Sequence, residues 1–415
     1  MDNQKYLVSV IIISFVLFLI VNLPRPIKVQ GDGIFYYGWA TSIIFDHDID
    51  LTNQLQKTYN YDFYSKYFID NNIKTQTNLI PSPYAFGSAI FWTPAILFVN
   101  VVHDIGQLFD ISLFVKDGYS EIYILMLNFT TWICGIVAIV FIFKSLKYYF
   151  NFTISLVSVI MIWFATPFIY YHIFEPSMSH TMSIMASSIF LWYIFKSINT
   201  QKINYIVTGV IIFLMVTIRW QNIIFVAATL PVYIHFFTKQ INIRVFVSIF
   251  FATSTFAIIQ MYVWKKIYNV FLLIPQGDKF IGKSFHFFEI LFSSNRGLFI
   301  WSPVIIIALS GIYFLYKKQK YVAIMCILAF VGQWIINSIL SDPGGGDAFG
   351  GRRFIGVLPF IALMLGAIVE RIKYKKSMLV VALVFVIWNI ILIQNYLRGS
   401  IPHSGTFNIL KIKYI

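Results

Sequence analysis

Charged residues and cysteines are scarce in this sequence. Only 12% of its 415 residues are charged, against about 25% in typical soluble proteins, and 59% are hydrophobic. The two cysteines, Cys134 and Cys326, both lie in apolar stretches, so we expect free buried thiols and no disulfide or thiolate metal site. Together with a mean hydropathy of +0.76, this composition excludes a soluble globular domain.

Several familiar catalytic and nucleic-acid motifs are also absent. The sequence has 31 Lys and Arg against 17 Asp and Glu, a formal net charge of +14, yet no basic run is dense enough to indicate a nucleic-acid partner. We find no HExxH metal motif, no dinucleotide-binding glycine fingerprint and no Ser-His-Asp arrangement. The glycine-rich stretch at 343–351 is not a Walker loop, because no Lys-Ser/Thr pair follows it.

Long apolar runs recur from one end of the sequence to the other. Each approaches about 20 residues, enough to cross about 30 Å of hydrocarbon as a helix. The first run is longer than the hydrophobic part of a signal peptide and has no small-residue cleavage site before Pro24, so we predict a retained span. The runs are 6–23, 83–102, 120–143, 153–171, 179–195, 203–218, 221–238, 245–264, 297–316, 321–340, 354–370 and 377–396.

Basic residues orient these runs. Short Lys and Arg clusters fall at every second connection, and Lys5 precedes the first run. Because cytoplasmic loops collect Lys and Arg, one alternating topology in the cell membrane places all of them in the cytoplasm, together with the N-terminus. The polar stretches 24–82, 265–296 and 341–353 then face outward. The clusters are Lys144/Lys147, Lys196/Lys202, Lys239/Arg244, Lys317/Lys318/Lys320 and Arg371/Lys373/Lys375/Lys376.

The run at 83–102 does not fit this alternation. Two inside residues, Lys5 and Lys144, require an even number of crossings between them, but three runs separate them. Pro94 breaks the run at 83–102, since proline removes a helix hydrogen bond. We expect this run to dip into the membrane from the outer face without crossing, beside a site. The predicted fold is a single all-α polytopic transmembrane domain over 1–415, with about 11 spans (roughly 10 to 12).

The first polar stretch, 24–82, is rich in Phe, Tyr and Trp. Aromatic side chains favour the membrane interface, so we expect short helices that lie on the membrane. The stretches 265–296 and 341–353 are expected to join them around a cavity.

One carboxylate stands close to the end of the first span. Asp32 lies in the stretch Gly31-Asp32-Gly33, and a carboxylate at the hydrocarbon edge loses hydration, which raises its proton affinity and suits a general base. The alternative is that Asp32 only caps a helix beginning at Gly33, because Asp is a favoured N-cap.

Two further acidic features have both a functional and a plain interpretation. The segment Asp46-His47-Asp48-Ile49-Asp50 is either a metal cluster or a solvated acidic turn. Glu175, five residues before His180, is either a site residue or a satisfied group at the membrane edge.

Four arginines lie in or beside outer connections, against the trend for basic residues to stay inside. Arg219 interrupts an apolar stretch, and Arg296 opens a later span. Arg352 and Arg353 follow the glycine-rich stretch at 343–351. Arginine binds phosphate oxygens bidentately, whereas the alternative is an interfacial side chain that reaches toward lipid headgroups. Carboxylates and arginines on one outer face suit a lipid phosphate with a base beside it.

The residues after the first span resemble a known membrane superfamily. Asp32, with Tyr36 and Tyr37 behind it, resembles the first outer loop of the GT-C superfamily of polyprenyl-phosphate-sugar glycosyltransferases, which includes protein O-mannosyltransferases and lipid A aminoarabinose transferases. Three short stretches are similar to segments of bacterial members: 84–94 (YAFGSAIFWTP), 295–303 (NRGLFIWSP) and 350–354 (GGRRF).

The resemblance implies the catalytic residues and the reaction. It implies a catalytic carboxylate at Asp32 and a second acidic residue at Glu175. The first would take a proton from an acceptor hydroxyl, which attacks the anomeric carbon of a sugar carried on a polyprenyl phosphate. The acceptor would be a glycan, a lipid or a protein on the outer face. The family pattern usually has a second acidic residue directly after the first, where this chain has Gly33.

The resemblance also implies how the donor is held. Arg296, Arg352 or Arg353 would stabilise the departing lipid phosphate, with Arg219 as a further candidate. Tyr36 and His180 are expected to contact the substrate as well. We assign no certain cofactor and leave a divalent metal open.

Two other functional classes fit part of the pattern. A transporter or flippase of a lipid-linked or anionic substrate would use the same arginines but would need no base, and it is expected to show inverted repeats, which the sequence lacks. A structural membrane subunit would leave the clustered outer charges without a role.

Overall fold

The computed structural model describes residues 2–237, 243–273, 281–282 and 285–408. Within these ranges the chain is helical, with one isolated β-bridge between Ile281 and Leu340 and no longer strand. In the described part of the chain, eight helices are long and apolar enough to cross a membrane by length and composition. These are α1 (Asp2–Asn22), α5 (Gly87–Leu108), α6 (Glu121–Leu146), α8 (His180–Thr200), α12 (Ile243–Tyr268), α17 (Lys320–Ser338), the continuous η5–α18 (Arg352–Val357 and Leu358–Val369) and α19 (Lys375–Leu397).

The remaining apolar runs form shorter or broken helices. Two are single helices, α7 (Phe152–Phe164) and α9 (Tyr205–Ile218). The run at 221–238 divides near Pro231 and the run at 297–316 divides at Pro303, because proline lacks the amide hydrogen that a helix needs. The second run divides again at Gly311. The pieces are η3 (Trp220–Asn222), α10 (Ile223–Ala228), α11 (Leu230–Phe237), α14 (Leu298–Trp301), α15 (Val304–Ser310) and α16 (Ile312–Lys318). The all-helical, multi-pass character is confirmed, and the count of about 11 spans stays a prediction.

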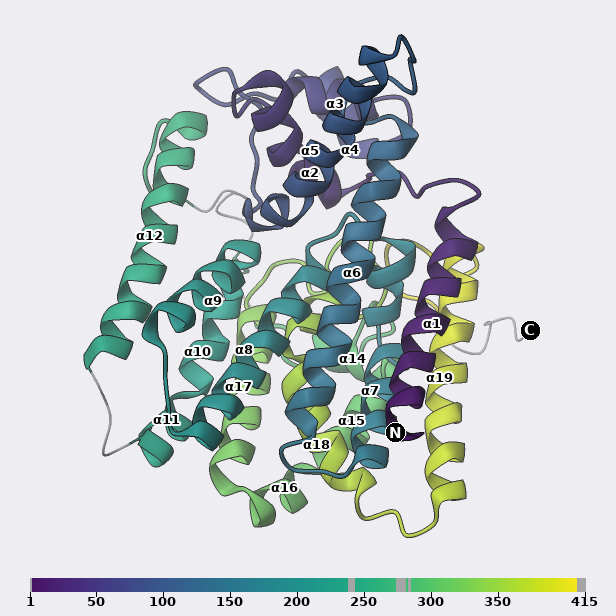
Figure 1. Ribbon diagram of the computed structural model, residues 1–415, viewed down its shortest axis with the longest axis vertical. Coiled ribbons are helices and arrows are strands. Elements are labelled where there is room, and N and C mark those ends of the chain that lie inside the picture. The colour runs from purple at the N-terminus through teal and green to yellow at the C-terminus, as the bar shows by residue number, and fades with distance from the viewer. Residues whose placement is uncertain (1, 238–242, 274–280, 283–284, 409–415) are drawn as a thin grey trace.

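The basic connections gather at one end of the molecule. Figure 1 shows the start of α1, the α6–α7 and α16–α17 connections and the α18–α19 connection at the lower end. Lys318 Nζ lies 2.8 Å from Glu370 Oε1 and donates to the carbonyl of Tyr149 at 2.8 Å, which joins three of these connections. Three basic connections therefore lie together at this end, while the alternating topology and its orientation in the cell stay predictions.

The first polar stretch folds into short helices at the opposite end, as expected (Figure 1). They are α2 (Asp32–Thr41), the π-helix η1 (Ser42–Asp46), α3 (Thr52–Thr58) and α4 (Phe63–Asp70). Asp62 joins two of them: its Oδ1 caps α4 by accepting from the amide of Ser65 at 3.0 Å, and its Oδ2 accepts from the amide of Gly31 at 2.8 Å. This bond fixes the entry of the chain into α2.

Helix α5 runs antiparallel to the outer half of α6. Near its start, Trp92 Nε1 donates to Thr131 Oγ1 at 3.0 Å, and further along Asn100 bonds to Tyr123, close to the start of α6. The chain thus enters α5 at mid-depth and climbs toward the layer that holds α2, α3 and α4 (Figure 1). Gly87 permits this entry, because a Cβ there would overlap the backbone of Ile218 at the end of α9. This packing is better explained by a segment that enters the membrane and returns to the same face than by a segment that crosses it.

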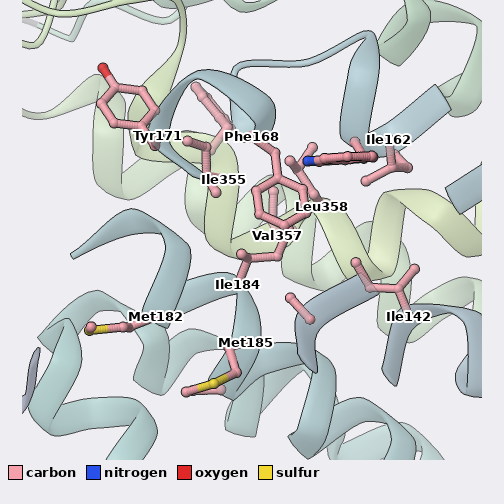
Figure 2. Close-up of a cluster of buried hydrophobic side chains, with 14 of the residues drawn as sticks. Ile142, Ile162, Phe168, Tyr171, Met182, Ile184, Met185, Ile355, Val357 and Leu358 are labelled. Atoms are coloured by element: carbon pink, nitrogen blue, oxygen red, sulfur yellow. The ribbon is translucent and has the colours of Figure 1, made fainter. Parts of the chain in front are cut away.

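The core lies between α6, α7, α8 and α18. Helix α8 packs along α6, and α18 packs against α7 and α15. Figure 2 shows part of this core, with buried side chains from several elements: Ile142, Ile162, Phe168, Tyr171, Met182, Ile184, Met185, Ile355, Val357 and Leu358. The π-helix η2 (Tyr170–Phe174) and the short helix α13 (Glu289–Phe292) connect this core to the outer end.

Candidate functional site

A cavity of about 650 Å³ lies where the first outer stretch meets the outer ends of the later helices. Its polar wall comes from α2, the start of α8, the turn after α9 and the glycine-rich connection before η5. Its apolar wall comes from the end of α9, from α12 and from the end of α17. The polar wall contains Asp32, Tyr36, Tyr84, His180, Arg219, Asp342, Arg352 and Arg353, and the apolar wall contains Ile218, Trp220, Trp264, Leu273, Ile281, Ile336, Ile339 and Leu340.

Asp32 opens α2 but does not cap it. The N-cap position belongs to Gly31, at a φ of 57°, and no side-chain bond caps the helix. The carboxylate is instead held by two partners. Tyr84 OH donates to Oδ1 at 2.7 Å, and Arg352 Nη2 lies 3.1 Å from Oδ2. The expected proximity of Asp32 to a site arginine is therefore confirmed, while its role as a base stays a prediction.

Burial and the Asp32 carboxylate both act on Tyr84. They raise the pKa of its phenol well above the usual value, burial being the larger cause. The Tyr84 hydroxyl is therefore a permanent donor to Asp32 in the neutral pH range.

Gly33 stands where the family pattern would have a second acidic residue, and the structure gives a physical reason. A Cβ at this position would lie 2.7 Å from the Cβ of Ser177 and 3.1 Å from its carbonyl oxygen. The turn that connects η2 to α8 therefore packs directly on the first turn of α2. No side chain fits at Gly33 unless this turn moves.

Arg352 and Arg353 both reach the cavity, as expected. Arg352 Nη2 donates to the carbonyl of Gly345 at 2.7 Å in addition to its contact with Asp32. Its Nη1 is buried and has no hydrogen-bond partner among the described residues. Arg353 bonds to the carbonyl of Asp342, and its Nη2 lies 3.6 Å from the Asp342 carboxylate. The unpartnered Nη1 is a buried cationic donor at the cavity wall.

Arg219 lies on the same cavity and joins the end of α9 to the start of α8. Its Nη1 donates to Ser179 Oγ at 3.2 Å and lies 3.2 Å from His180 Nδ1. Since a guanidinium can only donate, His180 Nδ1 accepts, and the imidazole proton lies on Nε2. Among the described residues Arg219 forms no salt bridge with a carboxylate, unlike Arg352 and Arg353.

Tyr36 completes this cluster. Its hydroxyl is hydrogen-bonded to Ser179, and burial raises the pKa of the phenol above its usual value, while Arg219 opposes the rise. Tyr36 therefore faces the cavity as a neutral hydroxyl, and with His180 it presents neutral hydrogen-bonding groups beside the arginines.

Arg296 differs from the expectation that it shares the cavity. Its residue is only 3% exposed, and its guanidinium bonds to Asn295 and to backbone carbonyls from two distant segments. Nε donates to Ala348 at 2.7 Å, and the two Nη atoms bond to the carbonyls of Pro402, His403 and Gly405. These carbonyls occupy its donors, so Arg296 holds protein segments together and does not line the cavity.

Glu175 is buried behind the cavity wall at the end of η2. It is 7% exposed and does not line the cavity. Burial raises the pKa of its carboxyl to about 8, and Asp32 adds to the rise while Arg352 opposes it. Within the described part of the chain no hydrogen bond or salt bridge holds this carboxyl. It is therefore mostly protonated at neutral pH.

The acidic segment 46–50 forms local bonds. Asp46 Oδ2 accepts from Gln54 Nε2 at 2.7 Å, Asp48 Oδ1 accepts from Ser42 Oγ at 2.7 Å, and Asp50 Oδ1 accepts from Thr52 Oγ1 at 2.9 Å. Over the described ranges no group of three or more His, Cys, Asp or Glu side chains is placed to hold a metal ion. The turn interpretation fits this geometry better than the metal interpretation.

Three further residues that line the cavity were not predicted from the sequence. Tyr84 holds Asp32, and its position just before the proline-interrupted run was the available signal. Trp220 and Trp264 form an edge-to-face pair with ring centroids 5.3 Å apart in the apolar wall. Trp220 follows Arg219 directly in sequence, but Trp264 lies in an apolar helix where nothing distinguishes it from the other lipid-facing or core aromatics.

No protein-family model matches this chain, and no curated protein sequence matches it either. The GT-C resemblance therefore rests on the short motifs quoted above.

Proposed function

We propose that this chain is a membrane glycosyltransferase that moves a sugar from a polyprenyl-phosphate donor to an acceptor hydroxyl on the outer face of the cell membrane. The proposal is supported by the resemblance of the region around Asp32 and by the amphipathic cavity beside it. We propose Asp32 as the base, and Arg352, Arg353 and Arg219 as the groups that bind the phosphate.

The observation that carries the proposal is the Asp32–Arg352 contact of 3.1 Å at a cavity wall. A carboxylate and a guanidinium in contact there supply both a proton acceptor and an anion site. Arg352 keeps a buried donor, Nη1, without a partner. Such a group costs free energy unless a ligand or water satisfies it, and a phosphate oxygen is its natural partner. The apolar wall offers room for the start of a lipid tail.

The proposed reaction is a single displacement. The acceptor oxygen forms a bond to the anomeric carbon while its proton passes to a carboxylate oxygen of Asp32. The bond between the anomeric carbon and the phosphate oxygen breaks, and the electron pair leaves with the lipid phosphate. The arginines stabilise the negative charge that develops on this phosphate, which is the electrostatic part of the catalysis. Tyr84 keeps the Asp32 carboxylate in place.

Glu175 has a supporting role in this proposal. Burial raises the pKa of Glu175 to about 8, whereas the Asp32 carboxylate contacts Arg352. Separate environments of two carboxyl groups commonly divide acid from base functions. Glu175 lies behind the cavity wall, so we assign it to the electrostatics of Arg352 and Asp32 and not to direct contact with the donor.

Replacing Asp32 with Asn separates transfer from transport. The change keeps the side-chain shape and removes its basicity. We expect sugar release from a radiolabelled polyprenyl-phosphate donor, in membranes that contain the protein, to fall on the order of a hundredfold or more. Binding of the donor should change little. The control is Asp110→Asn, an exposed carboxylate in the connection between α5 and α6.

Two outcomes would contradict the assignment. Transfer by the Asp32→Asn variant at the wild-type rate would remove Asp32 as the base. Movement of donor lipid between leaflets of proteoliposomes by wild type and Asp32→Asn alike, with no sugar transfer by either, would favour the transporter alternative.

A further inference from the structure

A second cavity, of about 510 Å³, lies at the far end of α2 from Asp32. It is lined from α2 and η1 by Thr41, Phe45 and Asp46, from α3 by Asn53, Gln54, Gln56 and Lys57, and from the connection before α6 by Lys116, Asp117 and Tyr119. Thr41 is the last residue of α2 and Asp32 the first, so about 14 Å of helix separates the two cavities. Helices α2 and α3, which line this second cavity, both belong to the outer layer in Figure 1.

Both lysines of this second cavity are paired with a carboxylate. Lys57 Nζ lies 3.5 Å from Asp117 Oδ2, and Lys116 Nζ lies 2.7 Å from Asp104 Oδ1. The other oxygen of Asp117 accepts from two backbone amides at 2.8 Å each. No arginine lines this cavity. The chemistry is therefore unlike the arginine-rich first cavity, and it does not suit a phosphate.

The groups that remain available are the Asp46 carboxylate, neutral hydrogen-bonding groups and aromatic rings. Gln54 is 3% exposed, its Nε2 donates to Asp46, and its Oε1 is buried without a partner among the described residues. The exposed Asn53 and Gln56 add two more side-chain amides to the lining. Phe45 and Tyr119 supply apolar ring surface. Carboxylate and amide oxygens accept from hydroxyl groups, amide nitrogens donate to them, and a few polar groups with aromatic neighbours are typical of small-ligand sites.

We propose that this cavity binds a neutral polyhydroxylated ligand, namely a segment of a carbohydrate chain. Sugar hydroxyls satisfy Gln54 Oε1 and the free oxygen of Asp46, and one sugar face rests on an aromatic ring. Carbohydrate binding at this cavity does not depend on the proposed transfer reaction. The additional inference that this carbohydrate is part of the acceptor rests on that proposed function. On that basis the acceptor is a glycan whose reacting end is at Asp32 and whose distal part is held beside Thr41.

Binding is tested on the full-length protein in detergent by saturation-transfer NMR with mannotriose, chitotriose and galactotriose. We expect saturation transfer to at least one trisaccharide. Gln54→Leu should weaken its binding about tenfold, because the buried amide contacts are lost. Asn53→Leu, at an exposed position where folding is not at risk, should also weaken it. The matched control Gln76→Leu, exposed in the same outer stretch, should have no effect.

The outcomes separate this inference from the proposed function. Trisaccharide binding that survives in Asp32→Asn supports a distinct carbohydrate site, whatever the transfer assay shows. The inference is overturned if no trisaccharide binds, if Gln54→Leu and Asn53→Leu bind as wild type does, or if only the cation spermidine binds. If transfer occurs but no trisaccharide binds, this inference fails and the proposed function stands.

Discussion

Asp32 and Arg352 contact each other at the cavity wall, and both side chains are largely buried. Their side chains are 14% and 11% exposed. In the proposed reaction the donor phosphate binds the unpartnered Nη1 of Arg352, so the contact between Nη2 and Asp32 can persist. The hydrogen bond from Tyr84 also holds the carboxylate.

Glu175 should make stability depend on pH. Burial raises the pKa of this carboxyl from 4.5 to about 8, so the folded state holds the proton more tightly than the unfolded state. The stability that this proton contributes is complete below about pH 4.5 and is lost as the pH rises through about 8. Glu175→Gln cannot ionise and should lack this loss. The difference should reach the order of a few kcal/mol, since one pKa unit corresponds to about 1.4 kcal/mol.

Thermal unfolding of both proteins in detergent between about pH 5 and pH 9 measures this difference. We expect similar midpoints at the acidic end and a higher midpoint for Glu175→Gln at the alkaline end. Parallel curves over the whole range would show that Glu175 is ionised in the folded protein. The control is Glu121→Gln, at the exposed first turn of α6. Glu370, although exposed, is not used because its carboxylate accepts a hydrogen bond from Lys318.

At the scale of elements, Arg296 connects three segments that approach the site. It is held in the turn before α14 and bonds to the glycine-rich connection at Ala348 and to the segment after α19 at Pro402 and His403. Lysine cannot reproduce the planar fork of donors. Arg296→Lys should therefore leave buried carbonyls without partners, at a cost of about 1–3 kcal/mol. Hydrogen exchange in 342–351 and 398–407 should accelerate on the order of tenfold.

Hydrogen-exchange mass spectrometry can follow both segments at once. The control Arg398→Lys changes an exposed arginine close to the same segment and should leave exchange unaltered. If Arg296→Lys instead loses donor binding while hydrogen exchange is unchanged, Arg296 is a phosphate ligand, as predicted from the sequence.

The sequence was enough to predict the apolar helices, the helical first outer stretch and a position of Asp32 near one of the arginines Arg296, Arg352 or Arg353. The composition, the regular spacing of the basic connections and the carboxylate after the first span can all be recognised in the sequence itself. The role of Arg296 could not be predicted, because an arginine that binds carbonyls and one that binds phosphate look the same in sequence. The prolines in the sequence indicate the helix breaks near Pro231 and Pro303. Whether each broken helix crosses the membrane depends on how its pieces pack.

At the scale of the whole molecule, we predict a topology in which the basic connections lie in the cytoplasm. Lys144 and Lys317 should lie inside, and Asp32, Glu175 and Arg352 outside; Lys279, also expected outside, lies beyond the described residues. The two native cysteines are buried, so they give little background for labelling. Single cysteines at the exposed positions Asn71, Ser112 and Lys147 test the scheme, because a returning α5 leaves 71 and 112 on the same side.

An impermeant thiol reagent applied to intact cells should label the cysteines at 71 and 112 and spare the one at 147. Labelling at 71 and 147 without 112 would mean that α5 crosses and that the connection after it lies inside. The packing of Gly118 against Thr41 and Phe45 argues for the first result.

The central claim is that the cavity beside Asp32 holds the phosphate of a lipid donor. A cryo-EM map of the full chain in nanodiscs with added undecaprenyl phosphate measures this most directly. We predict density for the phosphate within hydrogen-bond distance, about 2.7–3.2 Å, of Arg352 Nη1, with the first isoprene units along Trp220 and Trp264. Density for the lipid only on the outer surface of the helices, with the cavity filled by water, would contradict the claim.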